Sequence, residues 1–318
     1  MFFDSLPAHI RERLLSRAEN ATVALPEGDD PRVQEAASLL QRHAKVKTIL
    51  LSASNVSLHR ERTAAVMSKA CLRRGKTMTA EQAEFAQDPL FVAGALLEDN
   101  LVDAVVAGAV ATTPQVIRAV LGTVGTRPSR PLLTSCFLFK LRVPTPGGED
   151  VVVYADAGVI PQPTEVQLSV IAELAATAFE VWTGVPARVG FLSFSTHGSA
   201  EHPDVHKMRN AANAFAVENP GRLSEGELQF DAAVVPEVAI RKNQDSKLVG
   251  RTNVFVFPDL DAGNIAYKIT QRLAGAEAWG PILLGSAKPF SDLSRGASAS
   301  DIGHVALLTL ALGRGQST

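Results

Sequence analysis

A hydroxyl, a guanidinium and a carboxylate lie close together in this 318-residue chain, as Ser294, Arg295 and Asp301. They follow the apolar run 281–285, and a helical pattern begins near residue 299. Backbone N–H groups at a helix start are free to bind an anion, and an arginine adds a planar, bidentate grip on phosphate or carboxylate. The segment therefore predicts an anion site just ahead of a helix.

Asp301 has two possible roles in this segment. Ser298 and Asp301 have the spacing of a capping box, in which an acid on the first helical turn binds the backbone of the cap residue. Capping is the default interpretation, and the helix dipole weakens such a carboxylate as a base. Arg295 is harder to explain structurally, because a cation before a helix start opposes the dipole and a bound anion would resolve that conflict. Asp301 is thus a cap, a general base, or both.

The elements that must position these residues follow an α/β pattern. Apolar, β-branched runs alternate with helical periodicity, which is typical of parallel strands joined by crossover helices. Several of the runs are apolar throughout, as buried parallel strands are. The predicted strands are 22–26, 47–52, 103–108, 132–141, 151–159, 188–194, 253–259 and 281–285, and the predicted helices are 30–44, 113–124, 164–182, 261–275 and about 299–312.

The length of the chain is sufficient for two domains. The turn-rich residues 144–150 are the best internal boundary, although they also read as an ordinary hairpin loop between two strands. We expect a first α/β domain of residues 1–143 and 302–318 and a second of residues 144–301. The final helix suits either half.

Polar side chains also follow three other predicted strands. In open α/β folds, ligands bind outside the carboxyl ends of the strands. Taken singly, each cluster is better explained by helix capping, but four clusters at strand ends together favour a ligand site. The further candidates are Thr112, Thr113 and Arg118 after strand 103–108; Ser195, Thr196, Gly198 and Ser199 after strand 188–194; and Asn264 after strand 253–259.

Composition and motifs argue against several classes of protein. Hydrophobic residues make up 46% and charged residues 20%, which are ordinary globular values. The 31 basic residues nearly balance the 33 acidic ones and form no basic run, so nothing indicates nucleic-acid binding. The first residues lack the order of a secretory signal, and no apolar stretch has the length of a membrane helix. We expect a cytoplasmic protein that binds neither nucleic acid nor membrane.

No cofactor or metal motif is present either. Residues 280–285 have glycines at P-loop spacing but lack the Lys and hydroxyl residue that should follow, and no dinucleotide fingerprint follows a strand. His197, His202 and His206 lie near a turn and favour a solvated loop over a zinc site. Cys71 and Cys136 form no disulfide framework, so we expect them in the core of a protein from a reducing compartment.

With these residues in view, the chain resembles the phosphate acetyl/butyryl transferase family. The resemblance implies two three-layer α/β/α domains with mainly parallel sheets, in the isocitrate/isopropylmalate dehydrogenase-like architecture, with the active-site cleft between them. It also implies a homodimer, no metal, no permanently bound cofactor, and functional coupling to acetate kinase. The residues that carry it are 106–122, 154–175, 191–205, 226–239, 253–285 and 287–302, and more loosely 72–91.

The resemblance further implies an acyltransferase that reversibly moves an acetyl group between coenzyme A (CoA) and phosphate in a ternary complex. Ser294, Arg295 and Asp301 match the cleft residues of the family, and Arg118 and Arg73 match two further arginines, although Arg73 and Arg74 could exchange roles. A thiol with a pKa of about 8.5 needs a base, for which Asp301 is the candidate.

The remaining roles follow from the charges of the reaction. Arg295 and Ser294 suit stabilisation of the developing carbonyl oxyanion, an effect worth roughly 3 to 4 kcal/mol per donor. Arg118 or Arg73 would hold the phosphate in line.

Departures from the family pattern leave alternatives open. Ala297 and Ala157 stand where the family usually has cysteines, and His197 replaces a frequent lysine. These changes affect the acyl-chain preference and the affinity for CoA, so a propionyl or butyryl transferase, or a paralogue in ethanolamine or propanediol breakdown, is the main alternative. A catalytically silent acyl-CoA-binding module is an alternative of another class, against which the intact serine, arginine and aspartate argue. A dehydrogenase of the isocitrate type would need clustered metal-binding aspartates, which the chain lacks.

Overall fold

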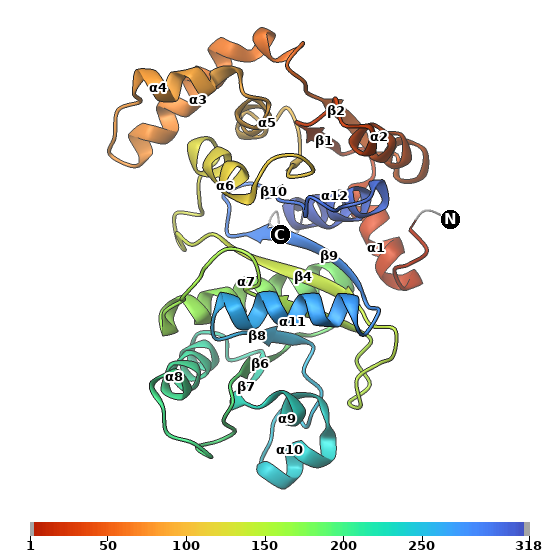
Figure 1. The fold of residues 1–318 in the computed structure, drawn as a ribbon, viewed down its shortest axis with the longest axis vertical. Coiled ribbons are helices and arrows are strands. Elements are labelled where there is room, and N and C mark those ends of the chain that lie inside the picture. Colours follow the sequence, from red (N-terminus) through yellow and green to blue (C-terminus); the bar gives the residue numbers. More distant parts are fainter. Residues whose placement is uncertain (1–2, 315–318) are drawn as a thin grey trace. The chain divides into compact units, whose positions relative to one another are not determined.

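The computed structural model describes residues 3–314 and contains two compact units (Figure 1). Unit 1 comprises Met1–Leu133 and Gly285–Thr318, and unit 2 comprises Thr134–Leu284. Each unit is an α/β structure built on one sheet. The expected domain bounds, 143/144 and 301/302, therefore differ from the division that the backbone contacts make.

Unit 1 contains a four-stranded sheet in the order β10-β3-β1-β2, and its strands are parallel throughout. The carboxyl ends of all four strands consequently lie at one edge of the sheet. The strands are β1 Thr22–Leu25, β2 Lys47–Leu50, β3 Ala104–Val106 and β10 Phe290–Ser291. The helices are α1 Ala8–Ala18, α2 Pro31–Ala44, α3 Arg60–Arg73, α4 Ala80–Glu84, α5 Pro89–Glu98, α6 Thr113–Gly122 and α12 Ala299–Arg314, with short 3₁₀ turns at Val56–His59 and Phe85–Gln87.

Local capping explains where several of these helices begin. Asp30 accepts a hydrogen bond from the N–H of Arg32 at 2.8 Å, and Asp88 accepts one from the N–H of Leu90 at 2.8 Å. A proline follows each of these aspartates at the first helical position, where no donor is lost. The last helix, α12, packs on α1, α2, β3 and β10, so it belongs to unit 1.

Unit 2 contains a six-stranded sheet in the order β7-β6-β8-β5-β4-β9. β4 pairs antiparallel with both β5 and β9, whereas the other strand pairs are parallel. The strands are β4 Thr134–Lys140, β5 Val151–Ala155, β6 Arg188–Leu192, β7 Leu223–Leu228, β8 Val254–Val256 and β9 Glu277–Leu284. The helices are α7 Glu165–Thr183, α8 Pro203–Glu218, α9 Phe230–Val234, α10 Pro236–Lys242 and α11 Leu260–Arg272.

The antiparallel pairing of β4 with β5 corrects the predicted domain boundary. Residues 144–150 connect two hydrogen-bonded neighbours, so the hairpin interpretation of this loop is confirmed and the boundary interpretation is wrong. Cys136 pairs with Ala155 and Lys140 with Val151. A domain border cannot fall within such a ladder without leaving its backbone groups unpaired.

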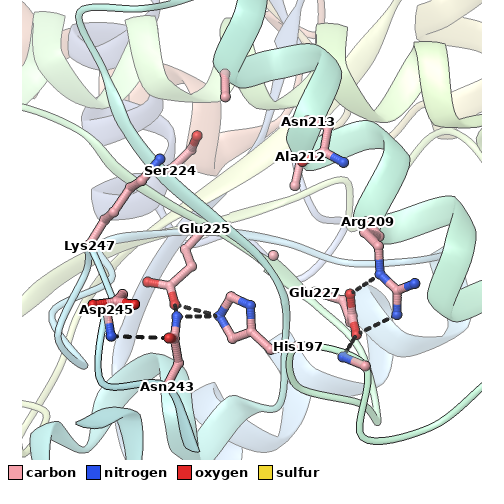
Figure 2. Close-up of a pocket in the computed structure, with 13 residues that line it drawn as sticks. His197, Arg209, Ala212, Asn213, Ser224, Glu225, Glu227, Asn243, Asp245 and Lys247 are labelled. Atoms are coloured by element: carbon pink, nitrogen blue, oxygen red, sulfur yellow. Dashed lines mark hydrogen bonds and ion pairs between the residues drawn. The ribbon is translucent and has the colours of Figure 1, made fainter.

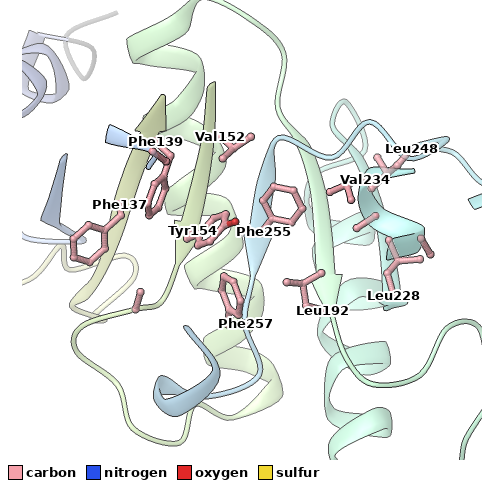
Figure 3. Close-up of a cluster of buried hydrophobic side chains, with 14 residues drawn as sticks. Phe137, Phe139, Val152, Tyr154, Leu192, Leu228, Val234, Leu248, Phe255 and Phe257 are labelled. Atoms are coloured by element: carbon pink, nitrogen blue, oxygen red, sulfur yellow. The ribbon is translucent and has the colours of Figure 1, made fainter. Parts of the chain in front are cut away.

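Aromatic side chains fill one face of the unit 2 sheet (Figure 3). The rings of Phe137 and Tyr267 stack with centroids 4.2 Å apart, and those of Phe139 and Tyr154 lie 4.6 Å apart. Phe255 and Phe257, both near-fully buried, extend the cluster. These large apolar surfaces, removed from water, hold the sheet against α11.

Both cysteines are buried and unpaired, as predicted for core residues. Burial, followed by the nearby charge of Asp156, raises the pKa of the Cys136 thiol far above its usual range. Among residues 3–314, no helix combines the length and apolar character needed to cross a membrane.

Candidate functional site

The Ser294-Arg295 segment connects β10 to α12 at the carboxyl edge of the unit 1 sheet. Both side chains are exposed. Within residues 3–314, the hydroxyl of Ser294 accepts only a long hydrogen bond of 3.4 Å, from the N–H of Gly296. The Arg295 guanidinium makes no hydrogen bond or ion pair within the described part of the chain. A hydroxyl and a free cation are therefore available to a ligand at this edge.

Asp301 forms the capping box that its spacing predicted. Its Oδ2 accepts hydrogen bonds from the N–H of Ser298 at 2.9 Å and from the Ser298 hydroxyl at 2.8 Å, and the N–H of Asp301 donates back to the Ser298 hydroxyl at 3.2 Å. The carboxylate is half-buried. All of these bonds use Oδ2 or the backbone, so capping engages only one oxygen of the carboxylate.

Arg32 on α2 holds the backbone of the same segment. Its guanidinium donates to the carbonyls of Arg295 at 2.9 Å and Ala297 at 3.0 Å. It also donates to the carbonyl of Ala109, after β3, at 2.8 Å. Asp30 orients the group through hydrogen bonds of 2.7 and 3.1 Å. One side chain thus joins the loops that follow β10 and β3. Because Arg32 binds the backbone carbonyl of residue 295, this contact does not depend on the side chain at that position.

Glu27, two residues after β1, accepts hydrogen bonds from the backbone of the loop after β3. Its carboxylate accepts from four successive N–H groups, at distances of 2.7 to 3.0 Å, in residues 108–111. Four convergent N–H groups make a typical anion-binding nest. In this protein the anion is a side chain of the chain itself.

The predicted substrate-binding threonines are also engaged internally. Thr112 is the N-cap of α6 and its hydroxyl lies 2.9 Å from Oε1 of Gln115, within a capping box. The hydroxyl of Thr113 donates to Oδ2 of Asp292 at 2.5 Å. Asp292 is fully buried, and this burial raises its pKa to about 7. Together with the bonds to Glu27, these contacts give the loop after β3 a structural role in positioning α6.

Arg118 borders a pocket of about 420 Å³ within unit 1. Its guanidinium lies over the ring of Phe85, 5.8 Å from the centroid. Arg74 borders the same pocket, whose other walls are mainly apolar: Met67, Cys71, Phe85, Phe91, Pro114, Ile117 and Leu121. An apolar pocket with two cations at its border suits an amphipathic, anionic ligand.

The structure separates the two candidate arginines at the end of α3. Arg73 forms an ion pair with Glu98 at 2.6 Å and donates to the carbonyl of Thr123 at 2.5 Å. Arg74 instead lies beside Cys71, with its Nη2 3.7 Å from the sulfur, at the border of the pocket. Arg74 therefore shares a pocket with Arg118, and Arg73 connects α3 to α5 and to the end of α6.

The predicted residues of the loop after β6 surround the buried carboxylate of Glu227 on β7. Oε1 of Glu227 accepts from the Ser195 hydroxyl at 3.1 Å and from the N–H of Gly198 at 2.7 Å. Ser199 and Thr196 brace the same loop, since the N–H of Thr196 donates to the Ser199 hydroxyl at 3.1 Å. The structure thus brings all four predicted residues together in one loop, and Ser195 and Gly198 bind a carboxylate that was not predicted from the sequence.

Glu227 and Glu225 lie at a second pocket, of about 490 Å³, within unit 2 (Figure 2). Arg209 pairs with Glu227 at 2.9 Å, and Nε2 of His197 lies 2.6 Å from Oε1 of Glu225. Burial by itself raises the pKa of Glu227, but hydrogen bonds from Arg209 and the Gly198 N–H outweigh it and lower that pKa to about 2. Both acids are held by protein donors, so His197 serves as a partner of a glutamate.

Asn264 lies on the first turns of α11. Its amide donates to the carbonyl of Ala157 at 3.1 Å, and its Oδ1 accepts from Lys268 at 2.7 Å. The neighbouring Gly263 allows this approach, because a Cβ there would lie 2.3 Å from the carbonyl of Asp156. Asn264 therefore binds helix α11 to the loop after β5.

The buried or half-buried acids that organise both sheet edges, together with Arg32, are not among the residues predicted from the sequence. Glu27 lies two residues after β1 and Asp292 directly follows β10, so carboxylates near strand ends were the available signal. Glu225 and Glu227 lie on β7, which was not predicted because its alternating acids conceal a strand with a buried inner face.

Comparisons with known proteins agree with this fold. Residues 6–310 match the family described as Phosphate acetyl/butaryl transferase. The chain is 39% identical to a phosphate acetyltransferase of Acetivibrio thermocellus, covering 94% of this chain and 96% of the relative. It is also 39% identical to one of Paracoccus denitrificans, covering 92% and 95%.

Two solved structures are similar over nearly their whole length. A phosphotransacetylase from Streptococcus pyogenes superposes with a TM-score of 0.86 at 32% identity, covering 97% of this chain and 99% of that one. The EutD phosphotransacetylase from Staphylococcus aureus gives a TM-score of 0.83 at 32% identity, covering 96% and 98%. From the family match and the identity over most of its length, the chain belongs to the phosphate acetyl/butaryl transferase family.

Proposed function

We propose that the protein is a phosphate acetyltransferase that reversibly converts acetyl-CoA and phosphate into acetyl phosphate and CoA. Relatives at 39% identity over most of the chain bear that name. The structural observation that carries the proposal is the exposed Ser294 and Arg295 on a backbone segment held by Arg32. A fixed backbone with free polar side chains is the arrangement that binding of a reacting anion requires.

In the proposed reaction, the CoA thiolate attacks the carbonyl carbon of acetyl phosphate and phosphate leaves. Asp301 removes the thiol proton through its Oδ1, because its Oδ2 is engaged with Ser298. Arg295 and Ser294 donate to the oxyanion that develops on the carbonyl. The acetyl group passes directly from phosphate to the CoA sulfur, and the thiol proton passes to Asp301 and from there to solvent or to the released phosphate. The chain's contribution is therefore proton removal, orientation and charge stabilisation.

The apolar pocket in unit 1 supports binding of CoA. Arg118 and Arg74 at its border would pair with phosphate oxygens, and the apolar walls would receive the less polar parts of the molecule. Arg73 was expected to hold the leaving phosphate, but it pairs with Glu98, so we propose Arg74 in its place as the second substrate-binding arginine. We propose that Ser195, Thr196, Gly198 and Ser199 shape the loop after β6, and that Asn264 holds the loop after β5.

Several further properties are proposed from membership of the family. We propose that the protein is a cytoplasmic homodimer with no permanently bound cofactor, that its architecture is isocitrate/isopropylmalate dehydrogenase-like, and that its acetyl phosphate is exchanged with acetate kinase. CoA is a co-substrate in this scheme.

The decisive experiment measures thioester formation, by its ultraviolet absorbance, from CoA and a series of acyl phosphates. We expect acetyl phosphate to give the highest kcat/KM. Equal or faster turnover of butyryl phosphate would replace the acetyl assignment with a longer-chain transferase. Binding of CoA without turnover of any acyl phosphate would indicate an acyl-CoA-binding module instead.

A further inference from the structure

Asp292 lies where β10, the Ser294-Arg295 segment and the start of α6 meet. It directly follows β10 and comes two residues before Ser294. Its Oδ2 accepts the hydroxyl of Thr113, the first residue of α6, at 2.5 Å. The same helix carries Arg118. A single side chain therefore joins the Ser294-Arg295 segment to the helix that borders the apolar pocket.

The backbone after β3 packs directly on this carboxylate. A Cβ at Gly108 would lie 2.3 Å from Oδ1 of Asp292 and 2.7 Å from the N–H nitrogen of Leu293, so the position admits glycine only. Oδ1 itself is buried and makes no hydrogen bond in the described part of the chain. Asp292 is thus enclosed, with Oδ2 bonded to Thr113 and the backbone N–H of Leu293 as the further donor that acts on the carboxylate.

Burial makes the ionisation of Asp292 costly, and a nearby charge that acts on it adds to this cost. Glu27 is the acid whose charge acts on Asp292, and its own donors are the N–H groups after β3. Arg32, the cation that joins the loops after β3 and β10, is directed at carbonyl oxygens and Asp30. On α12, which packs on β10, Asp301 binds Ser298 and His304 binds Ser300. No described basic side chain pairs with Asp292.

We propose that Asp292 is a positioning residue whose ionised form, by accepting the Thr113 hydroxyl, fixes the Ser294-Arg295 segment relative to α6 for acyl transfer. The inference rests on the proposed function. A hydrogen bond to a charged acceptor is shorter and stronger than one to a neutral acceptor, so protonation of Asp292 loosens this connection. Asp292 acts through Thr113 and its own chain neighbours, without contact to a substrate.

If the ionised form of Asp292 serves function but destabilises the fold, the stability of the protein and its activity should depend on pH in opposite directions. Burial raises the pKa of Asp292 to about 7, so the folded protein prefers the protonated form. Wild-type stability should therefore fall as the pH rises from about 4, near the ordinary aspartate pKa of 3.8, to about 7, while the positioning contact strengthens. If Asp292 were an ordinary structural acid, its pKa would be lowered by folding. Protein stability and the positioning contact would then both increase as the pH rises.

The test compares Asp292→Asn with Asp261→Asn, an exposed control in unit 2. We expect Asp292→Asn to lower kcat about tenfold or more while the KM for CoA and for acetyl phosphate change less than about threefold, since misplaced groups cost rate rather than binding. In urea unfolding, Asp292→Asn should be more stable than wild type at pH 8, and this difference should shrink toward pH 5. The acid limb of the kcat/KM profile near pH 7 should disappear in this variant.

Variants of Thr113 test the same contact from its other side. They give a result even if the Asp292→Asn variant does not fold. Thr113→Val removes the donor at nearly constant volume, and Thr113→Ser keeps it. We expect Thr113→Val to lower kcat as Asp292→Asn does, and Thr113→Ser to retain most of the wild-type kcat. Wild-type kcat in both Asp292→Asn and Thr113→Val, or an Asp292→Asn variant less stable than wild type at pH 8, would overturn the proposal.

The two proposals fail separately. A wild-type protein without acyl transfer would refute the proposed function, whereas the pH dependence of the Asp292→Asn stability difference needs no activity. If the wild type is active but its acid limb persists in Asp292→Asn, only the role of Asp292 is refuted.

Discussion

Asp301 and Ser298 hold each other at the start of α12, with Oδ2 of Asp301 2.9 Å from the N–H nitrogen and 2.8 Å from the hydroxyl of Ser298. The capping role of Asp301 is therefore real, and it leaves Oδ1 of the same carboxylate without a partner in residues 3–314. One oxygen positions the group and the other remains available to a thiol proton. The two roles can coexist because they use different atoms.

The capping and base roles of Asp301 separate in a pair of variants. Asp301→Asn keeps an oxygen for the cap but removes the base, so we expect turnover to fall by about 10² to 10³ with little change in stability. Ser298→Ala should lower the free energy of unfolding by about 1 kcal/mol with turnover per folded molecule nearly unchanged. Rapid thioester assays and urea unfolding check both. If Asp301→Asn lost only stability, Asp301 would be a cap alone.

Arg295 should act through its side chain alone, since Arg32 holds its carbonyl independently. We expect Arg295→Ala to lower kcat about 10²-fold to 10³-fold, as loss of an oxyanion donor does. Its unfolding free energy should stay within about 0.5 kcal/mol of wild type. Arg295→Lys keeps the charge but loses the bidentate fork, and should recover only part of the rate. A large increase in the KM for CoA at unchanged kcat would instead make Arg295 a cofactor anchor.

Arg32 connects three carbonyl groups in two loops, so its loss should loosen the Ser294-Arg295 segment. We expect Arg32→Lys to lower the free energy of unfolding by about 1 to 3 kcal/mol, because buried acceptors lose their donors. The kcat should fall in the same variant. Arg42→Lys, an exposed change on the same helix, is the matched control. Equal behaviour of the two variants in urea unfolding and kcat measurements would show that Arg32 is dispensable.

The arginines of unit 1 can be ranked by how much their substitution raises the KM for CoA. Arg118 and Arg74 border the apolar pocket, so we expect Arg118→Gln and Arg74→Gln to raise the KM for CoA about tenfold. Arg73→Gln should mainly lower stability, because it breaks the pair with Glu98. Steady-state kinetics at saturating acetyl phosphate make the comparison. A raised KM in Arg73→Gln at wild-type stability would return the binding role to Arg73.

The low pKa of Glu227 should make the stability of unit 2 sensitive to acid. Its pKa of about 2 in the folded protein lies below the ordinary glutamate value of 4.5, so its stabilising contribution is complete above pH 4.5 and is lost as the pH falls toward 2. A shift of this size corresponds to a contribution on the order of 3 kcal/mol. We expect Glu227→Gln to reduce the decrease in unfolding free energy between pH 5 and pH 2.

The matched control for this titration is Glu237→Gln, an exposed change in the same unit. It should leave the pH dependence unchanged. Urea midpoints measured across this pH range would contradict the prediction if both variants retained the full wild-type acid sensitivity.

Local patterns in the chain were sufficient for much of the fold. The eight predicted strands and five predicted helices all occur, because apolar runs and helical periodicity depend on neighbours in sequence. The capping box of Ser298 and Asp301 was visible for the same reason, since its partners are three residues apart. The family resemblance also rested on contiguous motifs, one of which contains Ser294, Arg295 and Asp301, the residues that their types and spacing had already indicated.

Only the tertiary structure decided which groups those residues contact. Arg32 meets Arg295 across 263 positions of sequence, and Thr113 meets Asp292 across 179. The antiparallel position of β4 between β5 and β9 likewise depends on pairing with a distant strand. Long-range hydrogen bonds and the burial of charge arise when the chain closes on itself, so local spacing in one sequence carries no record of them.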